Sequence, residues 1–218
     1  MPTAARLPGR RIAGLTALVL AIASMGSPVT PTRAASWSGG GYGTTAEGQL
    51  VALTNRSRAA AGRALLRLDP TLTWIARWRS RDMVQREFFS HSIPPSGRSV
   101  FDTLSDRGYC FDLAGENIGW NTYDDEVATE VVHRMFLDSP GHRQNILARD
   151  WDVIGVGSFK SPNGRKMWTV LFADRCDPDL PPGQAPTSAA PRRIDIRHTP
   201  AIAFDTIVPG LALRPRAT

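Results

Sequence analysis

The stretch DSPGHRQNI, residues 138–146, places a histidine directly after a Pro-Gly pair, at the point where an apolar helical pattern stops. Proline does not continue a helix, so the pair predicts the helix end and leaves His142 on a turn. The chain has only four histidines among its 218 residues. A single histidine on a turn is most often a solvated polar residue, so a chemical role for His142 requires partners elsewhere in the chain.

Two further residues have the chemistry to join His142. His91 follows a predicted helix, and Glu116 lies between two glycine-flanked turns, so each side chain is free to face a common site. Two imidazoles and a carboxylate are ligands that a zinc-like ion accepts, with a fourth position left for water. The same groups also suit proton transfer without a metal. By contrast, His133 lies in the middle of a helical pattern beside charged residues, and we expect it to be solvated.

Spacing alone supports such a site only weakly. The three residues are 25 and 26 positions apart, and the chain contains no HExxH motif of a helical zinc protease. It also lacks a GxSxG nucleophile motif and a Cys-His pairing motif. These patterns therefore leave the catalytic residues, and whether the protein is an enzyme, unassigned.

The charge distribution argues against a nucleic-acid partner. The formal charge is +6, but residues 1–34 hold four arginines and no acid. Residues 177–218 hold five arginines and four aspartates, which leaves a net charge of about +1 for the middle of the chain. That middle part has both signs interspersed and no basic run, so no electrostatic footprint for nucleic acid is present.

The N-terminus resembles an export signal. Arginines precede an apolar run at residues 15–23, and Thr32-Arg-Ala34 follows as a cleavage site. The run is too short to cross a bilayer comfortably. Residues 1–34 are therefore predicted to be a signal peptide, and the protein to be secreted or extracytoplasmic, with no integral membrane domain after signal removal. The alternative is an uncleaved anchor.

Three parts follow the signal. Residues 35–46 are rich in glycine and serine, which predicts a flexible linker. Residues 47–176 hold the periodic patterns of a folded domain. Residues 177–218 are proline-rich, which predicts a disordered tail. Within that tail an apolar piece, residues 201–213, either docks on the domain or stays loose.

Inside the domain, helical patterns come first and strand-like patterns follow. Helices are predicted from 45 to 62, from Pro70 to the Pro94-Pro95 pair, from 99 to 107 and from 122 to 139, the last with Thr122 and Asp125 as a capping box. Two strand-like runs, 153–159 and 167–173, flank a Pro-Asn-Gly turn and predict a hairpin. This order favours an α+β fold over repeated βαβ units.

The two cysteines predict one disulfide. Cys110 and Cys176 form an even count in a chain with an export signal, and they are not spaced as a CxxC redox or zinc motif. The alternative is a pair of free, buried thiols.

Four segments together resemble the CAP superfamily, the SCP-domain proteins that include cysteine-rich secretory proteins, antigen 5 and plant pathogenesis-related proteins. The resemblance covers about residues 47–176, and the compact Ser-Pro-Gly-His version resembles the short bacterial branch. The segments are Leu53-Thr-Asn-Arg-Ser-Arg58, Phe89-Ser-His91, Gly115-Glu-Asn-Ile118 and Ser139-Pro-Gly-His-Arg-Gln-Asn-Ile146, followed by the strand pair.

The resemblance implies a three-layer α-β-α sandwich with a small, largely antiparallel sheet. It implies that His91, Glu116 and His142 line one central cleft, and that Asn117 and Asn145 have structural roles beside it. Larger family members add a second glutamate before the second histidine. This chain has Phe136-Leu-Asp-Ser139 there, so only Asp138 is available as a substitute.

Three functions are compatible with these features. The resemblance favours an exported binding module whose cleft holds a divalent cation weakly and whose ligand is a lipid or cell-envelope component. A metal-dependent hydrolase of peptides or envelope material is the first alternative, although no separate general base is evident. The second alternative is a structural envelope protein whose histidines stabilise the fold.

Overall fold

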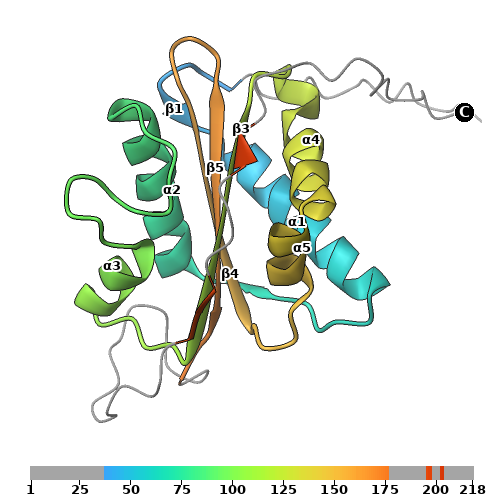
Figure 1. Cartoon of the computed structure of the whole chain (residues 1–218). Helices are drawn as coiled ribbons and strands as arrows, with labels where there is room; N and C mark the ends of the chain where they lie inside the picture. Colours follow the sequence, from blue (N-terminus) through green and yellow to red (C-terminus); the bar gives the residue numbers. More distant parts are fainter. Residues whose placement is uncertain (1–36, 177–194, 198–201, 204–218) are drawn as a thin grey trace, which may run out of the picture. The chain divides into compact units, whose positions relative to one another are not determined.

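Three long antiparallel strands form the centre of the fold. The computed structural model describes residues 37–176, 195–197 and 202–203. The strand order is β1-β4-β5-β3-β6, with β2 beside β4 and β7 beside β3 (Figure 1). The strands are β1 (Gly41–Tyr42), β2 (Arg67–Leu68), β3 (Leu113–Asn121), β4 (Val153–Lys160), β5 (Lys166–Asp174), β6 (Asp195–Arg197) and β7 (Ile202–Ala203).

Helices cover both faces of this sheet. Helices α2 and α3 lie on one face, and α1, α4 and α5 lie on the other (Figure 1). The predicted α+β class, a three-layer α-β-α sandwich with a largely antiparallel sheet, is confirmed. The helices are α1 (Thr44–Ala60), α2 (Pro70–Gln85), α3 (Val100–Asp106), α4 (Asp125–Asp138) and α5 (Pro140–Leu147).

Local signals explain where most helices begin. The Asp69 carboxylate accepts hydrogen bonds from the N–H groups of Thr71 and Leu72 at 2.8 and 2.9 Å, and Pro70 occupies the first turn of α2. The capping box predicted at Thr122 is wrong. Helix α4 has Asp124 as its N-cap, without a side-chain hydrogen bond. Asp125, the predicted partner of Thr122, has its carboxylate engaged by Lys160 and Lys166 of the β4–β5 hairpin instead.

Helix α2 ends well before the two prolines that were expected to stop it. Its last residue is Gln85, and Glu87 adopts a left-handed conformation with φ 53°. The N–H groups of Glu87 and Phe88 donate to the carbonyls of Val84 and Met83, which is the Schellman pattern. Glycine is the usual residue at this position because it has no Cβ penalty there.

We therefore expect Glu87→Gly to raise the free energy of unfolding by about 0.5–1 kcal/mol, the left-handed strain being partly offset by a more flexible unfolded chain. Chemical denaturation measures the change. Gln85→Gly, two residues earlier in a helical conformation, is the matched control and should lower stability by a similar amount. Equal losses in both variants would contradict the strain at Glu87.

The segment predicted as a flexible linker is folded from Trp37 onward, so that prediction is wrong for residues 37–46. Trp37 is buried, and its ring meets Trp168 edge-on at 5.5 Å between centroids. Its backbone N–H donates to Asp125 at 3.1 Å, and β1 pairs with β4 directly after it. The tryptophan is an apolar anchor within a polar run, which the composition of the segment conceals.

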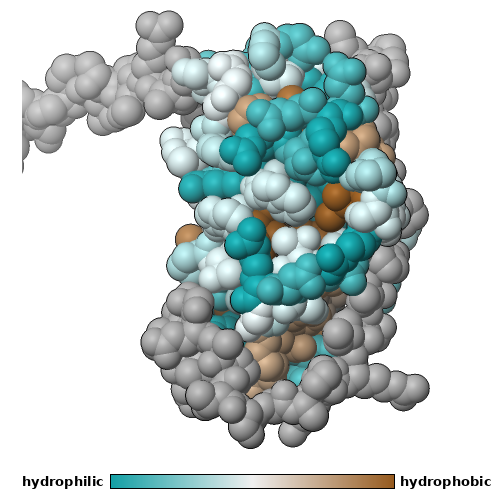
Figure 2. Space-filling model, turned by 90° about the vertical axis from the view of Figure 1, so that its left-hand side faces the viewer, coloured by the Kyte–Doolittle hydropathy of each residue, from teal (hydrophilic) through white to brown (hydrophobic). Residues whose placement is uncertain are grey.

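Two glycines of β4 allow α2 to lie very close to the sheet. A Cβ added to Gly157 would lie 2.0 Å from the backbone nitrogen of Arg77, and one added to Gly155 would lie 2.3 Å from the carbonyl carbon of Leu72. Both distances are far below any tolerated contact, so the helix and the strand touch backbone to backbone. The outer side of this layer is mainly hydrophilic with small apolar patches (Figure 2).

The predicted disulfide is confirmed. Cys110 and Cys176 are joined, with their Cα atoms 5.6 Å apart. Cys110 precedes β3 and Cys176 follows β5, and these neighbouring strands pair antiparallel with Leu113 opposite Asp174. The bridge therefore closes the end of the β3–β5 ladder.

The described part of the predicted tail consists of two short strands. Both β6 and β7 run parallel to β3, opposite residues 113–115 and 119–120. These five residues are paired, which differs from a wholly disordered tail. The remaining residues of 177–218, like the predicted signal at 1–34, lie outside the described residues. Across the described part, none of the helices has the length and apolarity needed to cross a bilayer.

Candidate functional site

Glu116 lies in the middle of a strand and not at a turn, as the flanking glycines had suggested. It belongs to β3, pairs with Leu171 of β5 and is 1% exposed. Successive strand residues face opposite sides of a sheet. Glu116 therefore faces α2, whereas Asn117 faces α5 and donates to the carbonyl of His142 at 3.1 Å.

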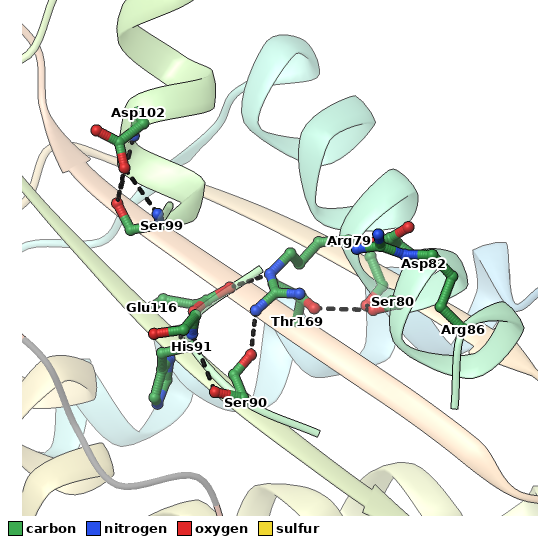
Figure 3. A network of polar contacts seen from close by, with 12 residues as sticks. Arg79, Ser80, Asp82, Arg86, Ser90, His91, Ser99, Asp102, Glu116 and Thr169 are labelled. Atoms are coloured by element: carbon green, nitrogen blue, oxygen red, sulfur yellow. Dashed lines mark hydrogen bonds and ion pairs between the residues drawn. The ribbon is translucent and has the colours of Figure 1, made fainter. Parts of the chain in front are cut away.

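Both carboxylate oxygens of Glu116 are engaged. Oε2 lies 2.5 Å from Nδ1 of His91, and Oε1 lies 3.2 Å from Nε of Arg79 (Figure 3). Arg79 comes from α2, is fully buried and also donates to the carbonyl of Ser90. The structure thus brings His91 and Glu116 together and adds an arginine that the sequence reasoning missed.

A signal for Arg79 was present in the sequence. The buried face of α2 includes Ile75 and Met83, and Arg79 lies four residues from each. A charged residue on such an apolar stripe is rarely buried without a partner. That position therefore indicates a buried ion pair.

His91 is held by its carboxylate partner in one orientation. It lies in the loop after α2, and its side chain is 15% exposed. The contact to Glu116 uses Nδ1, and the other ring nitrogen, Nε2, has no hydrogen-bond partner among the described residues. A carboxylate on one imidazole nitrogen fixes the ring and leaves the other nitrogen for a ligand.

His142 is buried inside a helix and not on a turn. The Pro-Gly pair does end α4, but Pro140 also begins α5 at once, because proline is favoured in a first helical turn.

The His142 ring is fully buried. His142 is 0% exposed, and the centroid of its ring lies 5.2 Å from that of Phe136. Neither ring nitrogen has a hydrogen-bond partner in the described part of the chain. Burial, and then the charge of His91, lower the pKa of His142 to about 4, so the ring is neutral at pH 7.

The two asparagines tie α5 to the sheet. Nδ2 of Asn145 donates to Oδ1 of Asn117 at 2.9 Å. The carbonyl of Asn145 accepts the indole N–H of Trp151 at 2.7 Å. Together with the bond from Asn117 to the backbone of His142, these contacts fix the position of the helix that carries the His142 ring.

A second buried arginine secures the other end of α5. Arg58 of α1 is fully buried, and its Nη1 donates to the carbonyls of Ile146 and Ala148, each at 2.8 Å. Carbonyls at a helix C-terminus lack partners within the helix, and a cation satisfies them. Arg58 is therefore a structural residue that lies outside the Glu116 site.

His133 is buried, so the expectation that it is solvated is wrong. Its side of α4 packs on α1, where Nε2 of His133 lies 2.9 Å from Oγ of Ser57. The residue is only 5% exposed. Burial, and then the charge of Arg56, lower the pKa of His133 to about 4. The prediction failed because α4 contacts both the sheet and α1, which makes its buried face wider than one apolar stripe.

The described residues do not form a three-ligand metal centre as they stand. No group of three His, Cys, Asp or Glu side chains in the described ranges is arranged to hold a metal ion. Glu116 is engaged on both oxygens, and Asp138, the one candidate for a second carboxylate, is exposed at the end of α4. The structure brings His91 and Glu116 into contact, and the charge of His91 acts on the His142 ring of α5. Each imidazole has an unpaired nitrogen among the described residues, and only that of His91 is fixed by a carboxylate.

Comparisons with known proteins agree with this fold. The model of the cysteine-rich secretory protein family, CAP, matches residues 51–172. The uncharacterized protein YkwD of Bacillus subtilis is 36% identical over 126 residues, or 58% of this chain and 46% of that protein. The uncharacterized membrane protein YlbC of Bacillus subtilis is 36% identical over 132 residues, or 61% of this chain and 35% of that protein. The chain thus spans less than half the length of either relative.

Two solved structures share the sandwich. An extracellular protein containing an SCP domain from Bacillus anthracis is 30% identical, with a TM-score of 0.52 over 61% of this chain and 41% of that one. An outer surface protein from Borrelia burgdorferi has a TM-score of 0.56 over 62% of this chain and 98% of that one, but at 20% identity it shows the fold alone. The family match covers more than half of the chain and coincides with the sandwich, so the protein belongs to the cysteine-rich secretory protein family, CAP.

Proposed function

We propose that this protein is an extracytoplasmic binding module in which His91 and His142 hold a divalent cation weakly. The observation that carries the proposal is the fully buried His142 ring, whose two nitrogens have no partner in the described part of the chain. Buried polar atoms almost always have a partner, and an exception points to a bound ion or ligand.

The extracytoplasmic location has three lines of support. The N-terminus has the pattern of an export signal. A disulfide joins the only two cysteines, and disulfides persist in oxidising compartments. The 30% identical Bacillus anthracis protein is described as extracellular.

The chemistry of the two histidines fits a cation. Neutral imidazole is a common ligand of zinc, and the low pKa of His142 keeps it neutral at physiological pH. The hydrogen bond from His91 to Glu116 is the type of outer contact that orients a metal-binding histidine. A cation bound there would supply a positive centre for an acidic or carbonyl group of the ligand.

The ligand class rests on the family resemblance. We propose a lipid or a cell-envelope component, which an exported binding module would meet outside the cytoplasm. Hydrolysis is the competing outcome, because His91 and Glu116 have the geometry of an oriented base.

Titrating zinc chloride into the purified chain at pH 7.5 should give weak, saturable binding by calorimetry. His142→Ala should weaken it by about tenfold or more, because one of two ligands is lost. His133→Ala is the matched control, since it removes a buried histidine from the α1–α4 interface and should leave binding unchanged. Equal binding by the His142→Ala and unmutated proteins would show that the two-histidine site is not used.

The same samples separate binding from catalysis. Casein and peptidoglycan should remain intact with zinc and with a chelator. Chelator-sensitive cleavage that is lost in His142→Ala would replace the binding function with the hydrolase alternative.

A further inference from the structure

The carboxylate of Glu116 already has a cationic partner built into the fold. Nε of Arg79 lies 3.2 Å from Oε1, and the side chains are 0% and 2% exposed. Arginine stays charged in proteins, so the guanidinium holds a positive charge beside this carboxylate. The second oxygen is taken by His91 at 2.5 Å.

Arg79 is held in this position by more than the ion pair. It donates to the carbonyl of Ser90, one residue before His91, and its guanidinium lies 5.3 Å from the ring centroid of Phe88. Figure 3 shows the guanidinium directed toward Glu116 and Ser90. These contacts leave the arginine no alternative rotamer without losing several buried interactions.

A divalent cation at Glu116 would have to lie beside this guanidinium. Burying charge without compensation is costly, and a like charge at close range in a poorly solvated site adds to the cost. One carboxylate balances one arginine and leaves nothing to balance an ion of charge +2. The carboxylate that the sequence suggested as a metal ligand is therefore electrostatically occupied.

We propose that Arg79 is a specificity-determining residue that takes the place of a metal ion at Glu116 and excludes divalent cations from that carboxylate. The inference deepens the proposed function and rests on it for the role of the two histidines. It assigns the weakness of cation binding to one side chain. Removing the charge of Arg79 should release Glu116 as a third ligand.

The test compares zinc binding by the unmutated chain and by Arg79→Gln, with calorimetry and with the zinc-induced shift of melting temperature. The variant should bind zinc about tenfold or more tightly, because a carboxylate ligand is gained and a positive charge is lost. Arg58→Gln is the matched control, because it also removes the charge of a fully buried arginine. The hydrogen bonds that this arginine makes among the described residues include those to the carbonyls of Ile146 and Ala148 and none to Glu116, so this variant should leave zinc affinity unchanged. Adding Glu116→Gln to Arg79→Gln should abolish the gain.

Each outcome decides between this inference and the proposed function. Equal affinity of Arg79→Gln and unmutated chains would overturn the inference and leave the two-histidine site intact. Zinc binding by the variant alone would uphold the inference and overturn the proposed function. If Arg79→Gln is unfolded without metal, circular dichroism should show refolding on zinc addition. Failure to refold in saturating zinc would overturn the inference as well.

Discussion

Replacing Cys110 and Cys176 with serine should lower the free energy of unfolding by about 4 kcal/mol. The two cysteines are 66 residues apart in sequence, and in the chain-entropy model a cross-link of that length restricts the unfolded chain by roughly this amount. The enclosed segment holds the three long strands β3, β4 and β5 together with α4 and α5, so the cross-link restricts most of the sheet and two of the three helices on one face. Guanidinium denaturation of the oxidised proteins measures it.

A reducing agent provides the internal control. It should destabilise the unmutated protein to the level of the double variant and leave the double variant unchanged. A double variant within about 1 kcal/mol of the oxidised protein would mean that the unfolded chain is already constrained by residual structure.

Acid should destabilise the protein through His133. Its pKa is about 4 in the folded state and ordinarily 6.5, so below pH 6.5 the unfolded chain takes up a proton that the folded chain refuses. The free energy of unfolding is therefore not reduced by His133 above pH 6.5, and it falls as the pH drops from 6.5 toward 4. Linkage gives a loss of about 2–3 kcal/mol between pH 7.5 and pH 4.5 from this one residue.

The variant His133→Gln isolates this effect. Glutamine keeps a polar group within reach of Ser57 but does not titrate. Urea denaturation at the two pH values should show that the variant loses about 2–3 kcal/mol less than the unmutated protein. His142, whose pKa is also about 4, is present in both proteins and its contribution cancels, as do those of the carboxylates. The same pH dependence in both proteins would show that His133 is accessible to water.

Much of the fold is predictable because its signals are local. Asp69 and Pro70 mark the start of α2 by a mechanism that needs no tertiary contact. The apolar, strand-like runs on either side of the Pro-Asn-Gly turn predict β4 and β5 for the same reason. Glu116 was misplaced because the glycines around it, which usually indicate turns, lie here in a central strand under closely packed side chains. A Cβ at Gly119 would lie 2.9 Å from the ring of Phe136.

The candidate site is less predictable because its decisive contacts are between elements distant in sequence. The place of Arg79 on the apolar face of α2 indicates a buried ion pair, but its partner Glu116 is far away in sequence and is identified only by the packing of that helix on the sheet. The burial of His133 likewise depends on where α1 lies against α4. Sequence patterns identify which residues have the right chemistry, whereas their protonation and their partners follow from tertiary packing.

The glycine contact between α2 and β4 also determines which parts of the site are able to move. Where backbones touch directly, as at Gly155 and Gly157, there are no side chains whose rotamers could adjust to a sliding helix. Helix α2 and the sheet should therefore behave as one rigid body, with Arg79 and Glu116 both fixed in it. His91 lies beyond the end of that helix, in a loop that starts at the left-handed residue Glu87. His91 is tied to that body by Glu116, and Ser90 by Arg79, so a hinge motion of this loop on ligand binding is expected only if those two contacts break, with the ion pair staying in place.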